Sequence, residues 1–234
     1  MRGLRRKTID DKSLIGGKYN MTIKWLGHSC FLLTDSEGTK VRVDPCDPAT
    51  GYDIGVHEVD AVTSSHSHHD HSYFAAAEGN PRIINEPGKY TVNNIKITGY
   101  PTWHDDAQGA LRGRNIMYLF EMDGLRVLHA GDLGQLPDED TIKAICHVDV
   151  LLVPVGGVYT IDHRGARELA NTLGIKVLIP MHYQTDALQF ELEDVTPLLD
   201  HASGCAIHRM RQSEASITPE SLGNDRIIVL DYRA

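Results

Sequence analysis

Seven side chains of the types that bind transition metals occur in a suggestive order along the chain. Four of them lie within six residues, so one short loop can direct several donors at one point; they are His66, His68, Asp70 and His71. The other three must be brought to this loop by folding; they are His104, Asp132 and His182. Imidazole nitrogen and carboxylate oxygen suit zinc, manganese or iron. The pattern therefore predicts a metal centre.

The spacing favours two metal ions. Residues two apart in an extended turn can converge on one ion, and that first ion would be held by His66, His68 and His104. The residues that follow can face a second ion, which would be held by Asp70, His71 and His182. The two oxygens of Asp132 could bridge the pair. Two ions about 3.5–4 Å apart can activate a water and stabilise a leaving group. A tract of solvated surface histidines is the alternative, and the interrupting aspartate argues against it.

Six further residues are candidates for supporting or lining this centre. The Asp44 carboxylate could hold a ligand histidine by its other ring nitrogen, although a strand-end Asp-Pro turn would also account for it. His129 precedes Asp132 by three residues and is expected to support a ligand or to face the substrate. The other candidates could line a pocket, with Arg114 binding phosphate or carboxylate; for each of them packing or a plain surface position is the alternative, and they are His28, Arg114, Tyr159 and Tyr183.

Short segments with strand patterns precede most of these residues. Alternating or continuous apolar runs predict strands at 21–26, 30–33, 40–43, 60–64, 82–84, 94–98, 115–120, 125–128, 148–153, 177–180 and 226–230. Asp123-Gly124 predicts a hairpin. Helices are expected at 73–78, 138–144, 162–173 and 191–202. Hairpins followed by strand–helix alternation predict an α/β fold with two sheets and helices outside, a four-layer α/β/β/α domain.

Composition limits the classes of protein to which the chain can belong. It has 234 residues and a net charge of −9, which disfavours non-specific binding to nucleic acid or an anionic membrane. No apolar run is long enough to span a membrane, and the basic first residues lack the apolar core of a signal peptide. Four cysteines without a C-x-x-C pair indicate free thiols in a reducing compartment, so a cytoplasmic protein is expected.

The pattern of the sequence changes at Met21. Residues 1–20 are polar and basic and are expected to form an N-terminal extension, while residues 21–234 form the predicted metal-binding domain. Translation could start at Met1 or at Met21, and the sequence does not decide between them.

From Met21 onward the chain resembles the metallo-β-lactamase superfamily. Within it, the resemblance is closest to a metal-dependent hydrolase branch with ascorbate-6-phosphate lactonase-like and N-acyl-phosphatidylethanolamine phospholipase D-like proteins. The segments that carry it are 26–29, 43–45, 66–71, 113–115, 129–132, 154–157 and 180–183. The resemblance implies an αββα sandwich, two metals at the sheet edges and the same seven ligands. The bridging position holds no cysteine, which argues against a cysteine-containing lactamase site.

The residues and the resemblance together predict a metal-dependent hydrolase. Two divalent cations, Zn²⁺ ahead of Mn²⁺ or iron, would lower the pKa of a bridging water, and the hydroxide would attack a small ester, lactone or phosphoester. Asp70 would orient that hydroxide and later accept a proton.

Two alternatives stay open at this point. One is a phosphodiesterase or nuclease on the same centre, which should show basic stripes or an added binding arm. The other is a non-hydrolytic metal-binding protein, either a di-iron redox protein or a metal-stabilised scaffold. A redox protein would need a partner flavin or cluster domain. The expected partner is a small-molecule substrate, with no nucleic acid and no membrane, and a homo-oligomer is left open.

Overall fold

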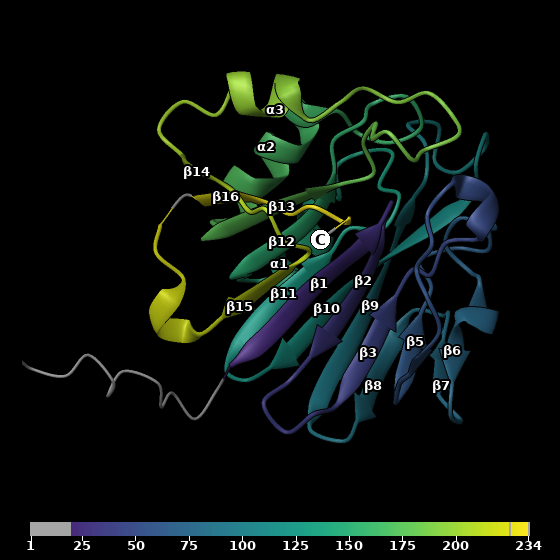
Figure 1. The fold of residues 1–234 in the computed structure, drawn as a ribbon. Helices are drawn as coiled ribbons and strands as arrows, with labels where there is room; N and C mark the ends of the chain where they lie inside the picture. The colour runs from purple at the N-terminus through teal and green to yellow at the C-terminus, as the bar shows by residue number, and fades with distance from the viewer. Residues whose placement is uncertain (1–19, 225, 234) are drawn as a thin grey trace, which may run out of the picture.

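The computed structural model describes residues 20–224 and 226–233. The predicted extension at residues 1–20 therefore lies, apart from Asn20, outside the described residues. The first strand begins at Met21, whose side chain is fully buried. Two large β-sheets lie face to face, and the α-helices lie beside one of them (Figure 1).

The first sheet has six strands in the order β15-β1-β2-β3-β5-β7. Their bounds are β1 Met21–Gly27, β2 Cys30–Thr34, β3 Lys40–Val43, β5 Ala61–Thr63, β7 Arg82–Ile84 and β15 Glu214–Ile217. Strands β1, β2 and β3 pair antiparallel, whereas β3, β5 and β7 run parallel. The carboxylate of Asp35 accepts hydrogen bonds from the backbone N–H groups of Glu37 and Thr39 and so closes the turn between β2 and β3.

The second sheet has eight strands in the order β14-β16-β13-β12-β11-β10-β9-β8. Their bounds are β8 Gly88–Val92, β9 Ile95–Trp103, β10 Arg114–Met122, β11 Leu125–His129, β12 Val150–Pro154, β13 Val177–Met181, β14 Ala206–Arg209 and β16 Arg226–Val229. Strands β8 to β11 form an antiparallel meander, and the remaining strands continue parallel to β11. The predicted hairpin at Asp123-Gly124 is confirmed, since it joins β10 to β11 with both residues at positive φ.

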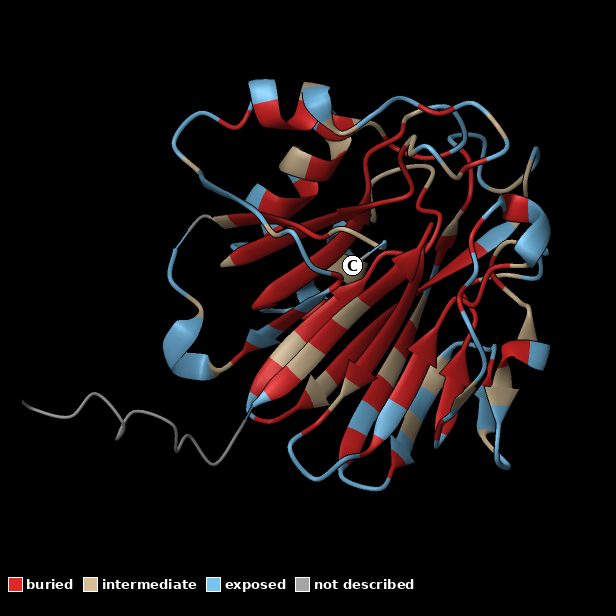
Figure 2. Cartoon of the chain, in the orientation of Figure 1, coloured by how far each residue is buried: buried red, intermediate tan, exposed pale blue. Residues whose placement is uncertain are grey.

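The main core lies between the two sheets. Alternate residues of β1 and β2, such as Trp25 and Phe31, point into it, while their neighbours Leu26 and Leu32 form a second cluster on the outer face of the first sheet. Figure 2 shows buried and partly exposed residues alternating along the first half of β1.

Helices cover the outer face of the second sheet; they are α1 Glu139–Ile145, α2 His163–Leu173 and α3 Thr196–Asp200. Helix α2 has the predicted limits: the Asp162 side chain accepts from the backbone N–H groups of Arg164 and Gly165, and Gly174 ends the helix in the left-handed conformation. No helix among the described residues is long and apolar enough to cross a lipid bilayer.

A thinner layer covers the outer face of the first sheet. It contains the 3-10 helices η1 Pro48–Thr50 and η2 Phe74–Ala76, and a two-stranded sheet of β4 His57–Glu58 and β6 Ala77–Glu78. A third 3-10 helix, η3 Pro219–Ser221, follows β15. The predicted four-layer α/β/β/α architecture is confirmed, with 3-10 helices and loops supplying most of this outer layer.

Two predicted helices were wrong or too long. Residues 73–78 form η2 and β6, because Tyr73 donates its backbone N–H to Pro45 and residues 77–78 pair with β4. The predicted helix 191–202 shrinks to α3, because the backbone of Leu192 and Glu193 donates hydrogen bonds to Gln184 and Gly156 instead. In both segments tertiary hydrogen bonds override local helix propensity.

Six strands that run in one direction end at the same edge of the sandwich. Strands β1, β3 and β5 of the first sheet and β9, β11 and β13 of the second are each followed by candidate site residues. The segments after these strands carry, in chain order, His28, Asp44, the 66–71 loop, His104, Asp132 and His182. Because their carboxyl ends meet at one edge, the fold gathers residues that are far apart in sequence.

Candidate metal centre

The first predicted ligand group is brought together by the fold. The ring nitrogens of His66, His68 and His104 can be chosen so that all lie within 4.8 Å of one another. His66 Nε2 and His68 Nδ1 are 3.0 Å apart, and His104 reaches them from the end of β9. His104 is buried whereas His68 is exposed, so this half of the centre opens toward solvent.

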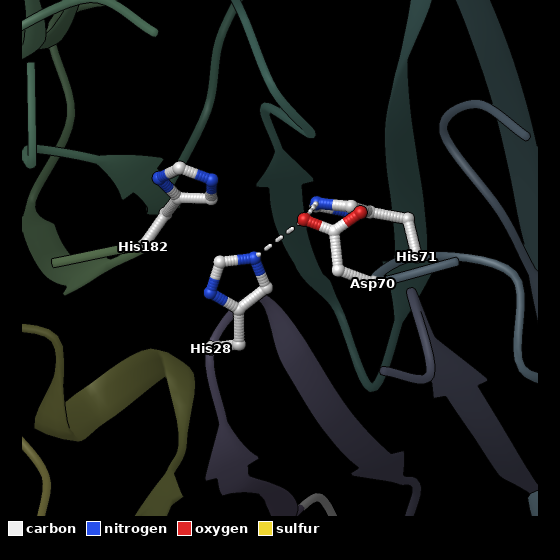
Figure 3. Close-up of side chains that lie close together, drawn as sticks. All are labelled: His28, Asp70, His71 and His182. Atoms are coloured by element: carbon white, nitrogen blue, oxygen red, sulfur yellow. Dashed lines mark hydrogen bonds and ion pairs between the residues drawn. The ribbon is translucent and has the colours of Figure 1, made fainter. Parts of the chain in front are cut away.

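The second group contains the predicted Asp70, His71 and His182 and, in addition, His28. Donor atoms of these four side chains also lie within 4.8 Å of one another. Figure 3 shows His28 and Asp70 facing each other, with 3.2 Å between His28 Nε2 and Asp70 Oδ2. The His28 ring lies 4.3 Å from that of His182 and is fully buried. His28 therefore belongs to the centre, although it does not line the cavity described below.

Asp132 lies between the two groups. Its Oδ2 is 3.3 Å from His104 Nε2 on one side, and 3.2 Å from both His71 Nε2 and His182 Nε2 on the other. With metal–nitrogen bonds of about 2.0–2.1 Å, neighbouring donors of a tetrahedral zinc site lie about 3.3 Å apart. The spacing of these donors therefore fits a pair of divalent cations that share Asp132.

A buried polar atom without a partner gives a second test of that fit. Among the described residues, Asp132 Oδ1 is buried and has no hydrogen-bond partner. Leaving a buried polar atom unpaired costs free energy, and native proteins rarely tolerate it. A cation held by the Asp132 carboxylate would satisfy this oxygen.

The electrostatics of the ligands suits metal binding. Burial, with the charge of His71, lowers the pKa of His66 to about 3, and burial, with His182, lowers that of His28 to about 4. Both rings are therefore neutral at pH 7, as a metal ligand must be. Burial opposes the charge on His71, but the carboxylates of Asp132 and Asp70 raise its pKa well above the ordinary value, so a cation bound at this ring would have to displace a proton.

The carboxylate pKa values show the same balance. Burial alone would raise the pKa of Asp132, but the neighbouring His182 and His71 hold it well below its ordinary value. Burial also opposes the charge of Asp70, yet His71 and the hydrogen bond from His28 lower its pKa. Both carboxylates are ionised at neutral pH and available to a cation.

Asp44 lies behind the ligands, where it was predicted. Its Oδ2 accepts hydrogen bonds from His71 Nδ1 at 2.8 Å and from Ser65 Oγ at 2.5 Å, and its Oδ1 accepts from the Ser65 backbone N–H. Burial works against the Asp44 charge, but His129 and the hydrogen bonds of His71 and Ser65 hold its pKa below the ordinary value. Asp44 thus fixes the ring of His71 with Nε2 directed at Asp132.

Asn115 supports Asp132 and was not singled out as a functional residue from the sequence. Its Oδ1 accepts the backbone N–H of Asp132 at 2.9 Å, while its Nδ2 donates to Thr102 Oγ1 and to the carbonyl of Ala130. The side chain is fully buried and ties β10 to the loop that carries Asp132. A buried asparagine in a strand was the available signal, and only the fold shows what it holds.

Gly131 allows this close approach. Its φ is +57°, and a Cβ at this position would lie 2.3 Å from Asn115 Oδ1 and 2.6 Å from Ser65 Cβ. Gly174 has a similar φ of +61° but has no atom within 4 Å of such a Cβ. A side chain at either glycine would strain the backbone, but only at Gly131 would it also collide with neighbouring atoms.

We expect Gly131→Ala to be more harmful than Gly174→Ala. Each substitution places a Cβ in the left-handed region, which costs about 1–2 kcal/mol. At Gly131 overpacking adds about 1–3 kcal/mol and displaces Asp132. Chemical denaturation measures the free energy of unfolding, and elemental analysis measures the metal content. Equal destabilisation by the two variants, with unchanged metal content, would contradict a close-packed role for Gly131.

A cavity of about 470 Å³ opens onto the ligands. Beside the predicted ligands it is lined by His69, Arg112, Tyr159 and Phe190. Tyr159 is thus placed where the sequence suggested. Arg114 is exposed and is not among the residues that line this cavity, whereas Arg112, two residues earlier, is.

Two other predicted residues are buried away from the cavity. Tyr183 is buried against Trp25, with ring centroids 5.3 Å apart, and does not line the cavity over the ligands. His129 is fully buried, hydrogen-bonds the Ser29 carbonyl through Nε2, and accepts the Gly131 backbone N–H at Nδ1. His129 thereby shapes the turn before Asp132 from behind and does not face the substrate cavity.

Comparison with known proteins agrees with this geometry. Residues 22–182 match the family model of the β-lactamase superfamily domain. A UPF0173 metal-dependent hydrolase from Methanoregula boonei is 33% identical over 188 residues, covering 70% of this chain and 83% of the relative. Another UPF0173 metal-dependent hydrolase, from Methanoculleus marisnigri, is 28% identical over 228 residues, covering 87% of this chain and 100% of the relative.

A solved structure shows the same architecture. It is a Thermotoga maritima protein assigned to the Zn-dependent hydrolases of the metallo-β-lactamase superfamily, with 38% identity and a TM-score of 0.75. The alignment covers 90% of this chain and 98% of that one. The predicted superfamily and its αββα sandwich are therefore confirmed. The chain belongs to the metallo-β-lactamase superfamily and, within it, to the UPF0173 metal-dependent hydrolases.

Proposed function

We propose that the protein hydrolyses a small ester, lactone or phosphoester at a binuclear metal centre. The observation that carries the proposal is the position of Asp132 Oδ2, within 3.3 Å of ring nitrogens from both ligand groups. A first cation would be held by His66, His68 and His104, and a second by Asp70, His71 and His182. Zn²⁺ suits this nitrogen-rich set, and Mn²⁺ or iron are the alternatives.

The bound cations would supply a hydroxide at neutral pH by lowering the pKa of a water molecule. Asp70 is the proposed proton acceptor, because it lies at the cavity wall and its low pKa keeps it ionised. His28 would position Asp70: its neutral ring donates from Nε2 to Asp70 Oδ2, so this nitrogen is committed to a hydrogen bond. The Tyr159 hydroxyl can donate a hydrogen bond to a substrate oxygen from the wall of the cavity.

The size of the cavity favours a small molecule as the substrate. About 470 Å³ lies within the range of small-molecule sites, and the aromatic side chains of Tyr159 and Phe190 give the cavity an apolar wall. A polymeric substrate would need an extended groove across the edge of the sheets.

Removing the metal is expected to abolish hydrolysis. The protein would be treated with a chelator, dialysed and assayed on a γ-lactone, a 4-nitrophenyl ester and bis(4-nitrophenyl) phosphate. We expect activity on one class, its loss in the metal-free protein, and its return with two equivalents of Zn²⁺ or Mn²⁺. His68→Ala, which removes a ligand of the first candidate group, should lower both the metal content and the activity. His147→Ala, at an exposed histidine outside the candidate centre, is its matched control. Activity that survives complete metal removal would contradict the proposal.

A further inference from the structure

One positive charge in the cavity is not used by the hydrolytic steps described above. Among the described residues that line the cavity, Arg112 has the only side chain with a permanent positive charge. The chain as a whole carries a net charge of −9, which repels anions. The positive charge of Arg112 beside the candidate metal centre can therefore attract an anion locally, although the protein as a whole is negatively charged.

The backbone that carries Arg112 is held rigidly. The carboxylate of Asp105 accepts four backbone N–H groups at 2.7–3.0 Å; their residues are Ala107, Gly109, Leu111 and Arg112. His104 closes the same loop by donating its backbone N–H to the Gly113 carbonyl at 3.1 Å. One loop thus fixes the proposed metal ligand His104 and Arg112 relative to each other, which is the pre-organisation that a binding site needs.

The guanidinium of Arg112 is held against an aromatic ring, but no acidic side chain among the described residues balances its charge. It lies 5.5 Å from the centre of the Tyr159 ring, and that ring packs at 6.1 Å against Phe190. Within residues 20–224 and 226–233 the guanidinium forms no hydrogen bond or ion pair with a protein acceptor. Stacking on an aromatic face leaves the N–H groups at the edge of the guanidinium free to bind an oxyanion through two parallel hydrogen bonds.

We infer that Arg112 binds a carboxylate or phosphate group of the substrate at a distance from the bond that is cleaved. The substrate is then a small anion whose apolar part contacts Tyr159 and Phe190. This inference rests on the proposed function, because it takes the substrate's reacting group to lie over the ligands of the candidate centre. It adds the charge of the substrate, which neither the ligand set nor the family determines.

Ligand binding to the metal-loaded protein tests this inference without turnover. Isothermal titration calorimetry would compare the dicarboxylates succinate, glutarate and adipate with the monocarboxylates propionate, butyrate and pentanoate. One carboxylate can occupy the metal centre and the second can reach Arg112. We expect the best-fitting dicarboxylate to bind at least about tenfold more tightly than its monocarboxylate partner. Elemental analysis after each titration verifies that the metal is retained.

Variants assign the difference to one side chain. Arg112→Gln should reduce the dicarboxylate preference to less than about threefold, and Arg112→Lys should retain part of it, because a point charge replaces a planar fork. The backbone bond from residue 112 to Asp105 does not depend on the side chain, so both variants should fold. Arg114→Gln is the matched control, since Arg114 is exposed and does not line the cavity.

Phosphonocarboxylates of matched length identify the anion. If 3-phosphonopropionate exceeds the best dicarboxylate in affinity and loses that advantage in Arg112→Gln, the group is a phosphate; otherwise it is a carboxylate. A wild-type protein without preference for the second anion, or an Arg112→Gln variant that retains the preference, overturns the inference. If Arg112 governs affinity but no ester, lactone or phosphoester is hydrolysed, the anion-binding role of Arg112 stands and the proposed hydrolysis fails.

Discussion

Asp132→Asn is expected to abolish hydrolysis and to release at least one of the two proposed metal ions. Asp132 Oδ2 contacts ring nitrogens of His71, His104 and His182, so this side chain reaches both ligand groups. The amide keeps the size of the side chain but removes its negative charge and one oxygen donor. We expect activity to fall by more than about 10³-fold, as when a group central to the reaction is removed.

Elemental analysis and steady-state kinetics measure the two effects of Asp132→Asn separately. Asp149→Asn is the matched control, because Asp149 is also buried and accepts a backbone hydrogen bond from Arg126, but it precedes β12 and so lies at the opposite end of the strands. The control should keep both metals and full activity. An Asp132→Asn variant that retains two metals and full activity would contradict the bridging role.

Asp44→Asn is expected to weaken metal binding without removing a ligand. The Asp44 carboxylate accepts from His71 Nδ1 and so directs His71 Nε2 toward the centre. Asparagine tolerates the left-handed backbone of this position, where φ is +44°, so the substitution adds little strain. Losing such a supporting carboxylate typically costs about 10–100-fold in metal affinity or activity. Competition with a chromogenic chelator measures the metal affinity.

Ser65→Ala removes one hydrogen bond that holds the Asp44 carboxylate in place but leaves its negative charge. The Ser65 hydroxyl donates to Asp44 Oδ2, while the Ser65 backbone N–H donates to Oδ1 and survives the substitution. The variant should therefore lose less metal affinity than Asp44→Asn does. A larger loss for Ser65→Ala would mean that the contact between Ser65 Oγ and His66 Nδ1, which are 3.0 Å apart, matters more than Asp44.

The sequence predicted the side chains of the candidate centre because they follow strands with a clear apolar pattern. Strand β13, for example, is a continuous buried run that ends directly before His182. The clustering of His66, His68 and Asp70 in one loop needed no long-range information. What the sequence could not resolve was the role of His28, because a lone histidine in a turn gives no sign of the Asp70 carboxylate that lies 42 residues away.

The walls of the cavity were harder to predict than the ligands. Arg112 and Arg114 are both basic and flank Gly113, and nothing local tells which of them faces the cavity. The choice depends on Asp105, whose carboxylate folds the loop so that Arg112 lies over Tyr159. The helix predicted at 191–202 was too long for a similar reason. The hydrogen bonds from its first residues to Gly156 and Gln184 are tertiary contacts, which a single sequence does not reveal.

Anomalous diffraction from metal-loaded crystals tests the binuclear centre most directly. Data collected at the absorption edge of the bound metal should show two peaks about 3.5–4 Å apart. One peak should lie among the rings of His66, His68 and His104, the other among the side chains of Asp70, His71 and His182, with the Asp132 carboxylate between them. A single peak in fully loaded crystals, or two peaks whose ligands exclude Asp132, would contradict the proposed centre.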